Sequence, residues 1–205
     1  MKKGAMFGLD ARIALAIFGA LSVISGAALY SAIKTAKMEQ LRQYLVEFSK
    51  ATEAYYLDNG KKIPQYTAST LMAPDLLENR ESLVTWKGPY LNSNKVNSFS
   101  MKDNITKMLG DASNVSIYLA SFSPWATNLG TWNTCALNDK DCASYIGFSS
   151  SGNLSAASLY PQVFKDLDEL VDGGDGPSNG KLRYLRLDSY SQRIYYMSMP
   201  YKRTT

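Results

Sequence analysis

The sequence contains no histidine and only two cysteines among its 205 residues. Histidine is the commonest general base and the commonest metal ligand, so catalysis by Ser/His/Asp or Cys/His pairs is excluded. The cysteines, Cys135 and Cys142, cannot complete a structural zinc site, because such a site takes four ligands. No combination of nucleophile, base and orienting residue can be named. The sequence therefore predicts a protein that is not an enzyme.

The sequence also lacks a strong charge imbalance. It has 22 basic and 18 acidic side chains, and its net charge is +4. Nucleic-acid-binding domains usually carry a pronounced basic surface. We therefore expect no nucleic-acid partner.

The longest uncharged stretch runs from Ile13 to Ile33. At about 1.5 Å rise per residue, about 20 apolar residues cross the hydrocarbon core of a bilayer as a helix. Lys2 and Lys3 precede this stretch, and the positive-inside rule places that end in the cytoplasm. The sequence predicts a single membrane-spanning helix with the following domain on the other side.

The helical pattern continues beyond the apolar stretch. Apolar residues recur at a spacing of three or four, which is the pattern of one buried helix face; they are Met38, Leu41, Leu45, Phe48, Ala51 and Tyr55. Asn59 and Gly60 can end a helix, and Pro64 prevents its resumption. We expect one long helix from about Ala11 to Asp58.

The N-terminal layout is Lys2, Lys3, Gly4 and Ala5, then a short uncharged segment, Asp10 and the apolar helix. This layout resembles the class III signal of type IV pilins and of the pseudopilins of type II secretion. The resemblance implies a prepilin peptidase that cuts this leader and methylates the new N-terminus. With Asp10 as the family's acid at the fifth mature position, the cut follows Ala5 and Met6 becomes the first residue. Cuts after Gly4 or Gly8 are the alternatives, as is a plain signal anchor that is never processed.

Two further segments extend the resemblance to major pseudopilins. Glu53–Gln65 (EAYYLDNGKKIPQ) resembles the end of the family's first helix, and Trp86–Ser93 (WKGPYLNS) resembles its Gly-Pro-Tyr-Leu segment. The implied fold is α+β and pilin-like, with a long N-terminal helix packed on a small antiparallel sheet and additional short helices. The implied organisation is a leader at 1–5, a membrane and fibre-core half-helix at 6–36, and a periplasmic or extracellular globular domain at 37–205.

The function implied by the resemblance is a structural subunit of a pilin-like fibre, either a secretion pseudopilus or a type IV pilus. The subunit enters the inner membrane as a precursor and polymerises by packing of its long helix. The helix-core positions are Phe18, Gly19, Leu21 and Gly26. The expected partners of the subunit are further copies of the same chain, minor pilins or pseudopilins, the inner-membrane assembly platform and the prepilin peptidase. The alternatives are a minor or DNA-uptake type IV pilin and, in another class, a membrane-anchored periplasmic binding domain that does not polymerise.

Asp10 is the expected assembly charge, because an acid at the rim of a membrane helix is costly and indicates a function. The amine of a mature Met6 can pair with Asp10 of the same or the next subunit. Arg12 is a rival partner in the same segment.

Outside the segments that carry the resemblance, local sequence patterns predict the remaining elements. Short helices are predicted at Ala68–Val84 and Ser98–Leu109, and a longer helix at Leu154–Val171. The predicted strands are Val115–Ser123, Ala143–Phe148, Leu182–Leu187 and Ile194–Met199, where β-branched and aromatic residues predominate. Cys135 and Cys142 lie close enough in sequence to form a small ring, and in an exported domain a disulfide is favoured over free thiols.

The loop after the predicted longer helix is acidic and rich in glycine. Asp168, Asp172 and Asp175, with Ser178 and backbone carbonyls of Gly173 or Gly176, offer the oxygen ligands that calcium prefers. Major pseudopilins hold calcium in a loop near the C-terminus, so the resemblance implies calcium as a cofactor. The alternative is a solvated turn in which Asp172 ends the helix.

Overall fold

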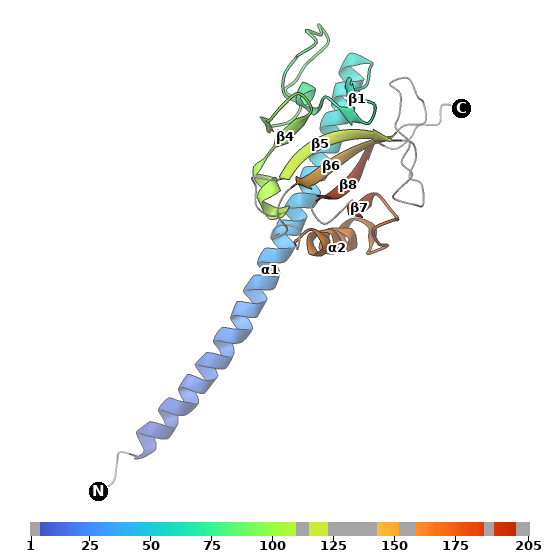
Figure 1. Ribbon diagram of the computed structural model, residues 1–205. Coiled ribbons are helices and arrows are strands. Elements are labelled where there is room, and N and C mark those ends of the chain that lie inside the picture. The colour runs from blue at the N-terminus through green and yellow to red at the C-terminus, as the bar shows by residue number, and fades with distance from the viewer. Residues whose placement is uncertain (1–4, 110–114, 123–142, 152–158, 187–190, 200–205) are drawn as a thin grey trace. The chain divides into compact units, whose positions relative to one another are not determined.

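The computed structural model describes residues 5–109, 115–122, 143–151, 159–186 and 191–199 (Figure 1). The chain forms two compact units, Met1–Lys37 and Met38–Thr205. Helix α1, Ala5–Asn59, contributes its first part to one unit and its second part to the other. The disulfide predicted between Cys135 and Cys142 lies outside the described residues.

The first unit consists of the N-terminal part of α1. Every side chain from Asp10 to Ile33 is exposed. Among the described residues, this is the one helix that is long and apolar enough to cross a membrane. The helix begins at Ala5 rather than near the predicted Ala11. Asp10 is the first residue of a type that commonly caps helices, yet it lies inside the helix.

The second unit contains one antiparallel sheet, in which the described strands run in the order β1-β2-β5-β6-β8-β7. Their bounds are β1 Gln65–Thr67, β2 Thr70–Leu71, β3 Asn94–Lys95, β4 Ser100–Lys102, β5 Val115–Phe122, β6 Ala143–Ser151, β7 Leu182–Arg186 and β8 Ser191–Met199. Strand β4 pairs with β3 and with β5. The 3-10 helices η1 (Ala73–Leu76) and η2 (Asn104–Leu109) and the helix α2 (Leu159–Asp172) complete the described elements.

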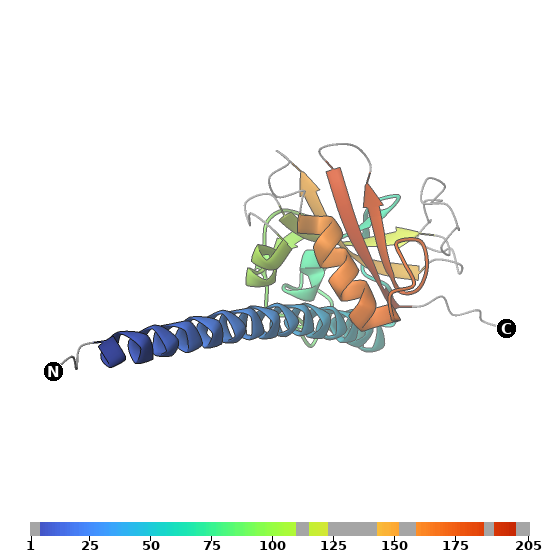
Figure 2. The same ribbon diagram turned by 90° about the horizontal axis from the view of Figure 1, so that it is seen from below.

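The second part of α1 and helix α2 bury their apolar faces in the same core, on one side of the sheet (Figure 2). Helix α1 contributes the predicted stripe from Met38 to Tyr55, in which Leu41, Leu45 and Phe48 are completely buried. Their partners from the sheet include Ile117, Leu119, Ile146, Phe148 and Ile194. The structure is therefore α+β, with a long N-terminal helix packed on an antiparallel sheet.

The opposite face of the sheet carries a second buried cluster, which is mostly aromatic. Because side chains alternate along a strand, Tyr118, Tyr145 and Tyr195 lie on this face. Gly147 stands opposite Tyr118 on one side and Tyr195 on the other. The two tyrosine rings meet at a centroid distance of 6.0 Å, and the Tyr118 hydroxyl donates to the Tyr195 hydroxyl at 2.7 Å. The missing side chain at Gly147 leaves room for this contact.

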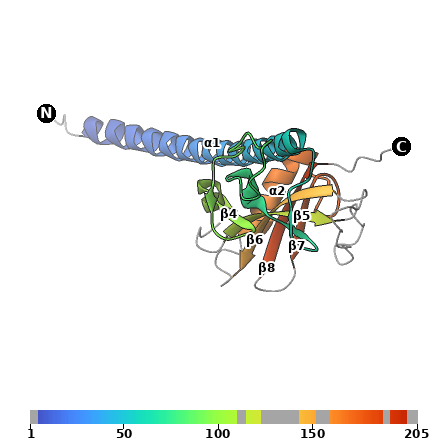
Figure 3. The ribbon, with the colours of Figure 1, turned by 90° about the horizontal axis from the view of Figure 1, so that it is seen from above.

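The segment between α1 and β5 differs from the prediction of short helices. It runs beside the C-terminal half of α1 (Figure 3) and places β2 and β4 one after the other along the same edge of β5. Only η1 and η2 are helical in the predicted ranges Ala68–Val84 and Ser98–Leu109. Pairing with β5 explains the difference, because Leu71 lies opposite Leu119 and Met101 lies opposite Ile117.

The later elements agree better with the sequence. The four predicted strands are confirmed as β5, β6, β7 and β8, with β6 and β8 longer than predicted. The predicted longer helix is confirmed as α2, although it is described only from Leu159. Its residues Val163, Phe164 and Leu167 are buried, whereas Leu170 is exposed.

The substitution Gly147→Ala should destabilise the protein by about 1–3 kcal/mol, because a buried side chain there overpacks the site. The new Cβ would lie 2.5 Å from the Tyr118 ring. Urea unfolding of the detergent-solubilised protein, followed by fluorescence, measures the effect. Ser149→Ala, on the same face of β6, is the matched control and should stay within about 0.5 kcal/mol of wild type. A Gly147→Ala protein as stable as that control would contradict the packing described here.

Candidate functional site

The loop from Gly173 to Lys181 joins α2 to β7 and is held by aspartate side chains. Asp172, the last residue of α2, accepts hydrogen bonds through Oδ2 from the backbone N–H groups of Lys181 and Leu182, at 2.8 and 2.7 Å. The chain passes so close to this carboxylate that a Cβ on Gly180 would lie 2.5 Å from it. Asp172 thus ties the end of α2 to the start of β7.

Asp168 lies one helical turn earlier and is only 3% exposed. Its Oδ2 accepts a hydrogen bond from the N–H of Gly176 at 3.0 Å. Its Oδ1 is buried and has no hydrogen-bond partner among the described residues. Burial raises the pKa of Asp168, and the nearby Asp175 and Asp172 carboxylates raise it further. The site therefore favours a positive charge at this position.

The structure brings three of the predicted calcium ligands together, the aspartates. One carboxylate oxygen from each of Asp168, Asp172 and Asp175 lies within 4.8 Å of the others. Ser178 is half-buried in the same loop. These ligands are hard oxygen atoms, which suit calcium better than a transition metal. The unpartnered Oδ1 of Asp168 gives such an ion a ligand that no protein group already occupies.

The predicted processing and assembly residues all lie in the first part of α1. Ala5 and Met6 are the first residues of the helix. Asp10 and Arg12 are exposed, as are Phe18 (70%) and Leu21 (58%). A Cβ placed on Gly19 or Gly26 would meet no atom within 4 Å. The side chains of Asp10, Arg12, Phe18 and Leu21 are therefore open to contact with another molecule.

The two segments that resemble pseudopilin motifs are in direct contact. Asp58, near the end of α1, accepts hydrogen bonds from the Tyr90 hydroxyl at 3.1 Å and from Lys87 Nζ at 3.0 Å. The hydrogen bond from Lys87 is the main cause that lowers the pKa of Asp58. The Tyr90 ring packs edge-on against Trp86 and against Tyr55. Glu53–Gln65 and Trp86–Ser93 therefore meet at the C-terminal end of α1.

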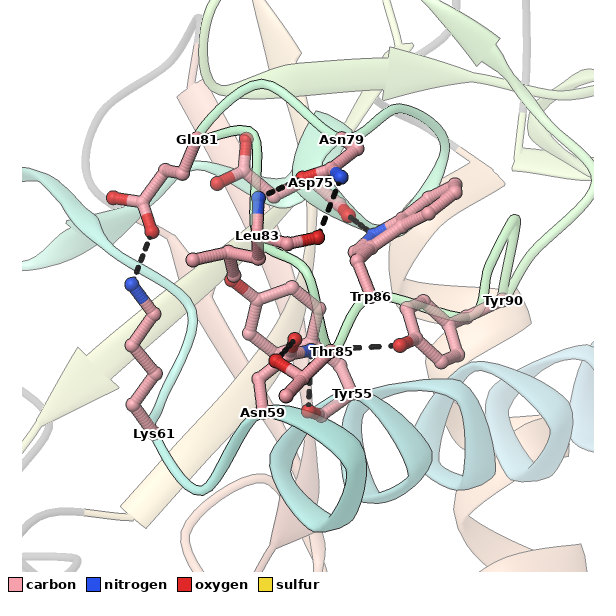
Figure 4. A network of polar contacts seen from close by, with 10 residues as sticks. All are labelled: Tyr55, Asn59, Lys61, Asp75, Asn79, Glu81, Leu83, Thr85, Trp86 and Tyr90. Atoms are coloured by element: carbon pink, nitrogen blue, oxygen red, sulfur yellow. Dashed lines mark hydrogen bonds and ion pairs between the residues drawn. The ribbon is translucent and has the colours of Figure 1, made fainter.

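Buried beside this junction is an acid that the sequence reasoning did not single out, Asp75 of η1 (Figure 4). It is 1% exposed, and neither carboxylate oxygen has a hydrogen-bond partner among the described residues. The nearest cation is Arg80, whose Nη1 lies 3.7 Å from Oδ1. Burial raises the pKa of Asp75 to about 6. An acid within a Pro-Asp-Leu-Leu run looks exposed in sequence, and the burial of η1 could not be anticipated.

The backbone around Asp75 is held by the same junction. The indole N–H of Trp86 donates to the Asp75 carbonyl oxygen at 3.1 Å (Figure 4). Thr85 donates to the Asn59 side chain at 2.8 Å, and Lys61 pairs with Glu81 at 2.5 Å. These contacts bind the loop between η1 and β3 to the end of α1.

Comparisons with protein-family models, with curated proteins and with solved structures found no match to this chain.

Asp75→Asn should make the protein more stable at pH 7, by about 2 kcal/mol, because it removes a buried charge without changing the shape of the side chain. Since burial raises the pKa of Asp75 to about 6, the folded state binds this proton more tightly than the unfolded state. Wild-type stability should therefore fall between about pH 4 and pH 6 and stay lower above that range. Urea unfolding at pH 4, 5, 6 and 7 measures this.

The difference between the Asn variant and wild type should be smallest at pH 4, because it disappears only below the ordinary pKa of 3.8, where Asp75 is protonated in both the folded and the unfolded chain. Glu81→Gln, a change to an exposed acid in the same loop, is the control and should give no comparable gain. An Asp75→Asn protein that is less stable than wild type at pH 7 would show that the carboxylate is stabilised in its charged form.

Proposed function

We propose that this chain is a structural subunit of a pilin-like fibre, closest in pattern to the major pseudopilin of type II secretion. The observation that carries the proposal is the division of α1. Its second part buries an apolar stripe in the globular unit, whereas its first part exposes apolar side chains on all sides. Such a surface is stable only in lipid or against other apolar helices.

The contact between the two motif segments supports the proposal. A Gly-Pro-Tyr segment from one part of the sequence packs on the tyrosine-rich end of the long helix. The two segments were identified separately by their resemblance to pseudopilins. If either segment resembled pseudopilins only by chance, there would be no reason for the two segments to lie in contact.

In this function the precursor is held in the inner membrane, with its N-terminus in the cytoplasm and the globular unit in the periplasm. Prepilin peptidase cuts after Ala5 and methylates Met6. The assembly platform then moves subunits from the bilayer into a helical homopolymer, with minor pseudopilins as further partners. The apolar surface of α1 exchanges lipid for neighbouring helices, and Asp10 is the charge that this exchange must neutralise.

Calcium is the proposed cofactor, held by Asp168, Asp172 and Asp175. An ion at this point would neutralise the acids that gather between α2 and β7, and it would add ligand bonds to the hydrogen bonds made by Asp172. Its role would be structural, because it would fix the start of β7 against the last turn of α2.

Asp10→Ala should leave membrane insertion intact but reduce the fibre sheared from cells at least about tenfold, because a helix packed in an apolar bundle loses its charge pairing. Quantitative blotting of the sheared fraction measures assembly, and carbonate extraction of membranes measures insertion. Ser25→Ala, an uncharged change on the same helix, is the control and should assemble normally.

Mass spectrometry of the same wild-type sample should find N-methylated Met6 as the first residue. An intact N-terminus together with absence of any fibre would contradict the proposed function and favour the plain membrane anchor. Normal fibres from Asp10→Ala would contradict the role of Asp10 alone.

Calcium at about 1 mM should raise the thermal unfolding midpoint of the purified protein by at least about 3 °C, since a ligand that binds only the folded state stabilises it. Asp175→Asn should abolish this shift while the hydrogen bonds of Asp172 remain. Asp166→Asn changes another acid of α2 outside the cluster and should keep the shift. An equal shift with magnesium, or none with calcium, would contradict a calcium site.

A further inference from the structure

The first part of α1 contains one acid and one arginine that no side chain among the described residues neutralises. Asp10 and Arg12 are the only charged residues between Ala5 and Ile33. Both are exposed, and neither makes an ion pair or a side-chain hydrogen bond to another described residue. An arginine does not deprotonate in proteins, so Arg12 must keep its charge in any environment that this helix enters.

The helix geometry prevents these two residues from pairing with each other. Both lie within the continuous helix Ala5–Asn59. At 3.6 residues per turn, two positions apart corresponds to about 200° around the axis, so i and i+2 side chains point to opposite sides. In water this has little consequence. In an apolar bundle it leaves Arg12 without a partner in its own segment, and an unpaired buried charge is strongly unfavourable.

The side of the helix that carries Arg12 also carries three glycines. Gly8, Gly19 and Gly26 follow one another at separations of 11 and 7 residues, which brings them to within about 20° of one another on the helix surface. Arg12 lies about 40° from Gly8 by the same count. A Cβ on any of the three glycines would meet no atom within 4 Å. A second helix can therefore approach the backbone at these glycines, between the larger side chains of Leu15 and Tyr30 on the same side.

We infer that the helix surface around Arg12 binds the opposite side of the same segment in a second copy of this chain, so that Arg12 of one copy pairs with Asp10 of the next. The inference rests on the proposed function, since it takes assembly of these helices as given. Charge identifies the second copy as the binding partner, because the same segment carries Asp10, the acid that Arg12 needs. Before assembly, the Arg12 guanidinium can pair with a lipid phosphate at the membrane surface. Arg12 loses that partner when the subunit leaves the bilayer.

This arrangement fixes the kind of assembly. Because the complementary charges are on opposite sides, a contact between two copies leaves one Asp10 and one Arg12 unsatisfied at the two ends. Contacts between different surfaces propagate into open assemblies unless the rotation closes a ring. A mature Met6 amine, four residues before Asp10 on the same side of the helix, can share the Asp10 carboxylate without replacing Arg12.

The test exchanges charges between two copies of the full chain with different tags. Asp10→Arg gives one copy two cations, and Arg12→Asp gives the other copy two acids. Each variant expressed alone should yield at least tenfold less sheared fibre than wild type, because like charges then meet at every contact. Co-expression should restore at least half of the wild-type yield, with both tags in the same fibres.

Two single variants complete the test. Arg12→Lys keeps the positive charge and should assemble, whereas Arg12→Leu should fail as Asp10→Ala does. Carbonate extraction confirms that each variant is inserted in the membrane. Two results would overturn the inference and leave the proposed function intact. One is a normal yield of fibre from both wild type and Arg12→Leu. The other is a co-expression yield no higher than that of either charge variant alone. Absence of fibres from wild type would instead overturn the proposed function.

Discussion

The removal of apolar helix surface from water governs both units of this protein. At about 25 cal/mol per Å² of apolar surface buried, the stripe of α1 from Met38 to Tyr55 is a major source of stability for the globular unit, where Leu41, Leu45 and Phe48 have no exposed surface. The part of α1 from Ile13 to Ile33 has no such cover. The second part of this one helix therefore buries its apolar surface within the globular unit, whereas the first part leaves its apolar surface uncovered.

The globular unit buries two acidic side chains, although burying a charge is unfavourable. Each lies where separate parts of the chain are in contact. Asp75 is buried in η1 beside the contact between the end of α1 and Trp86. Asp168 is buried where α2 meets the glycine-rich loop. Burial opposes the charged form in both cases. The difference is that Asp168 has other acids beside it, which suits a shared cation, whereas Asp75 has Arg80 at 3.7 Å.

Much of the fold could be predicted from local patterns, and the failures have a common cause. The helix stripe, the four long strands and α2 have clear apolar periodicity, and all are present. The short strands β2 and β4 have too few residues for any period, and they form only because β5 offers them a pairing edge. The three aspartates could be grouped because they lie within one turn of helix and a short loop. Asp75 could not be recognised, because its burial depends on distant residues.

The sheet leaves little backbone available for pairing with another molecule. On one side its outermost described strands are β1 and β3, of three and two residues. On the other side two outward N–H groups of β7 are already bonded, since Leu182 donates to Asp172 and Tyr184 donates to the Pro177 carbonyl oxygen of the loop after α2. Exposed strand edges are common routes to aggregation, and short or covered edges block them. Even at high local concentration, the described edges of the sheet thereby discourage globular units from joining strand to strand.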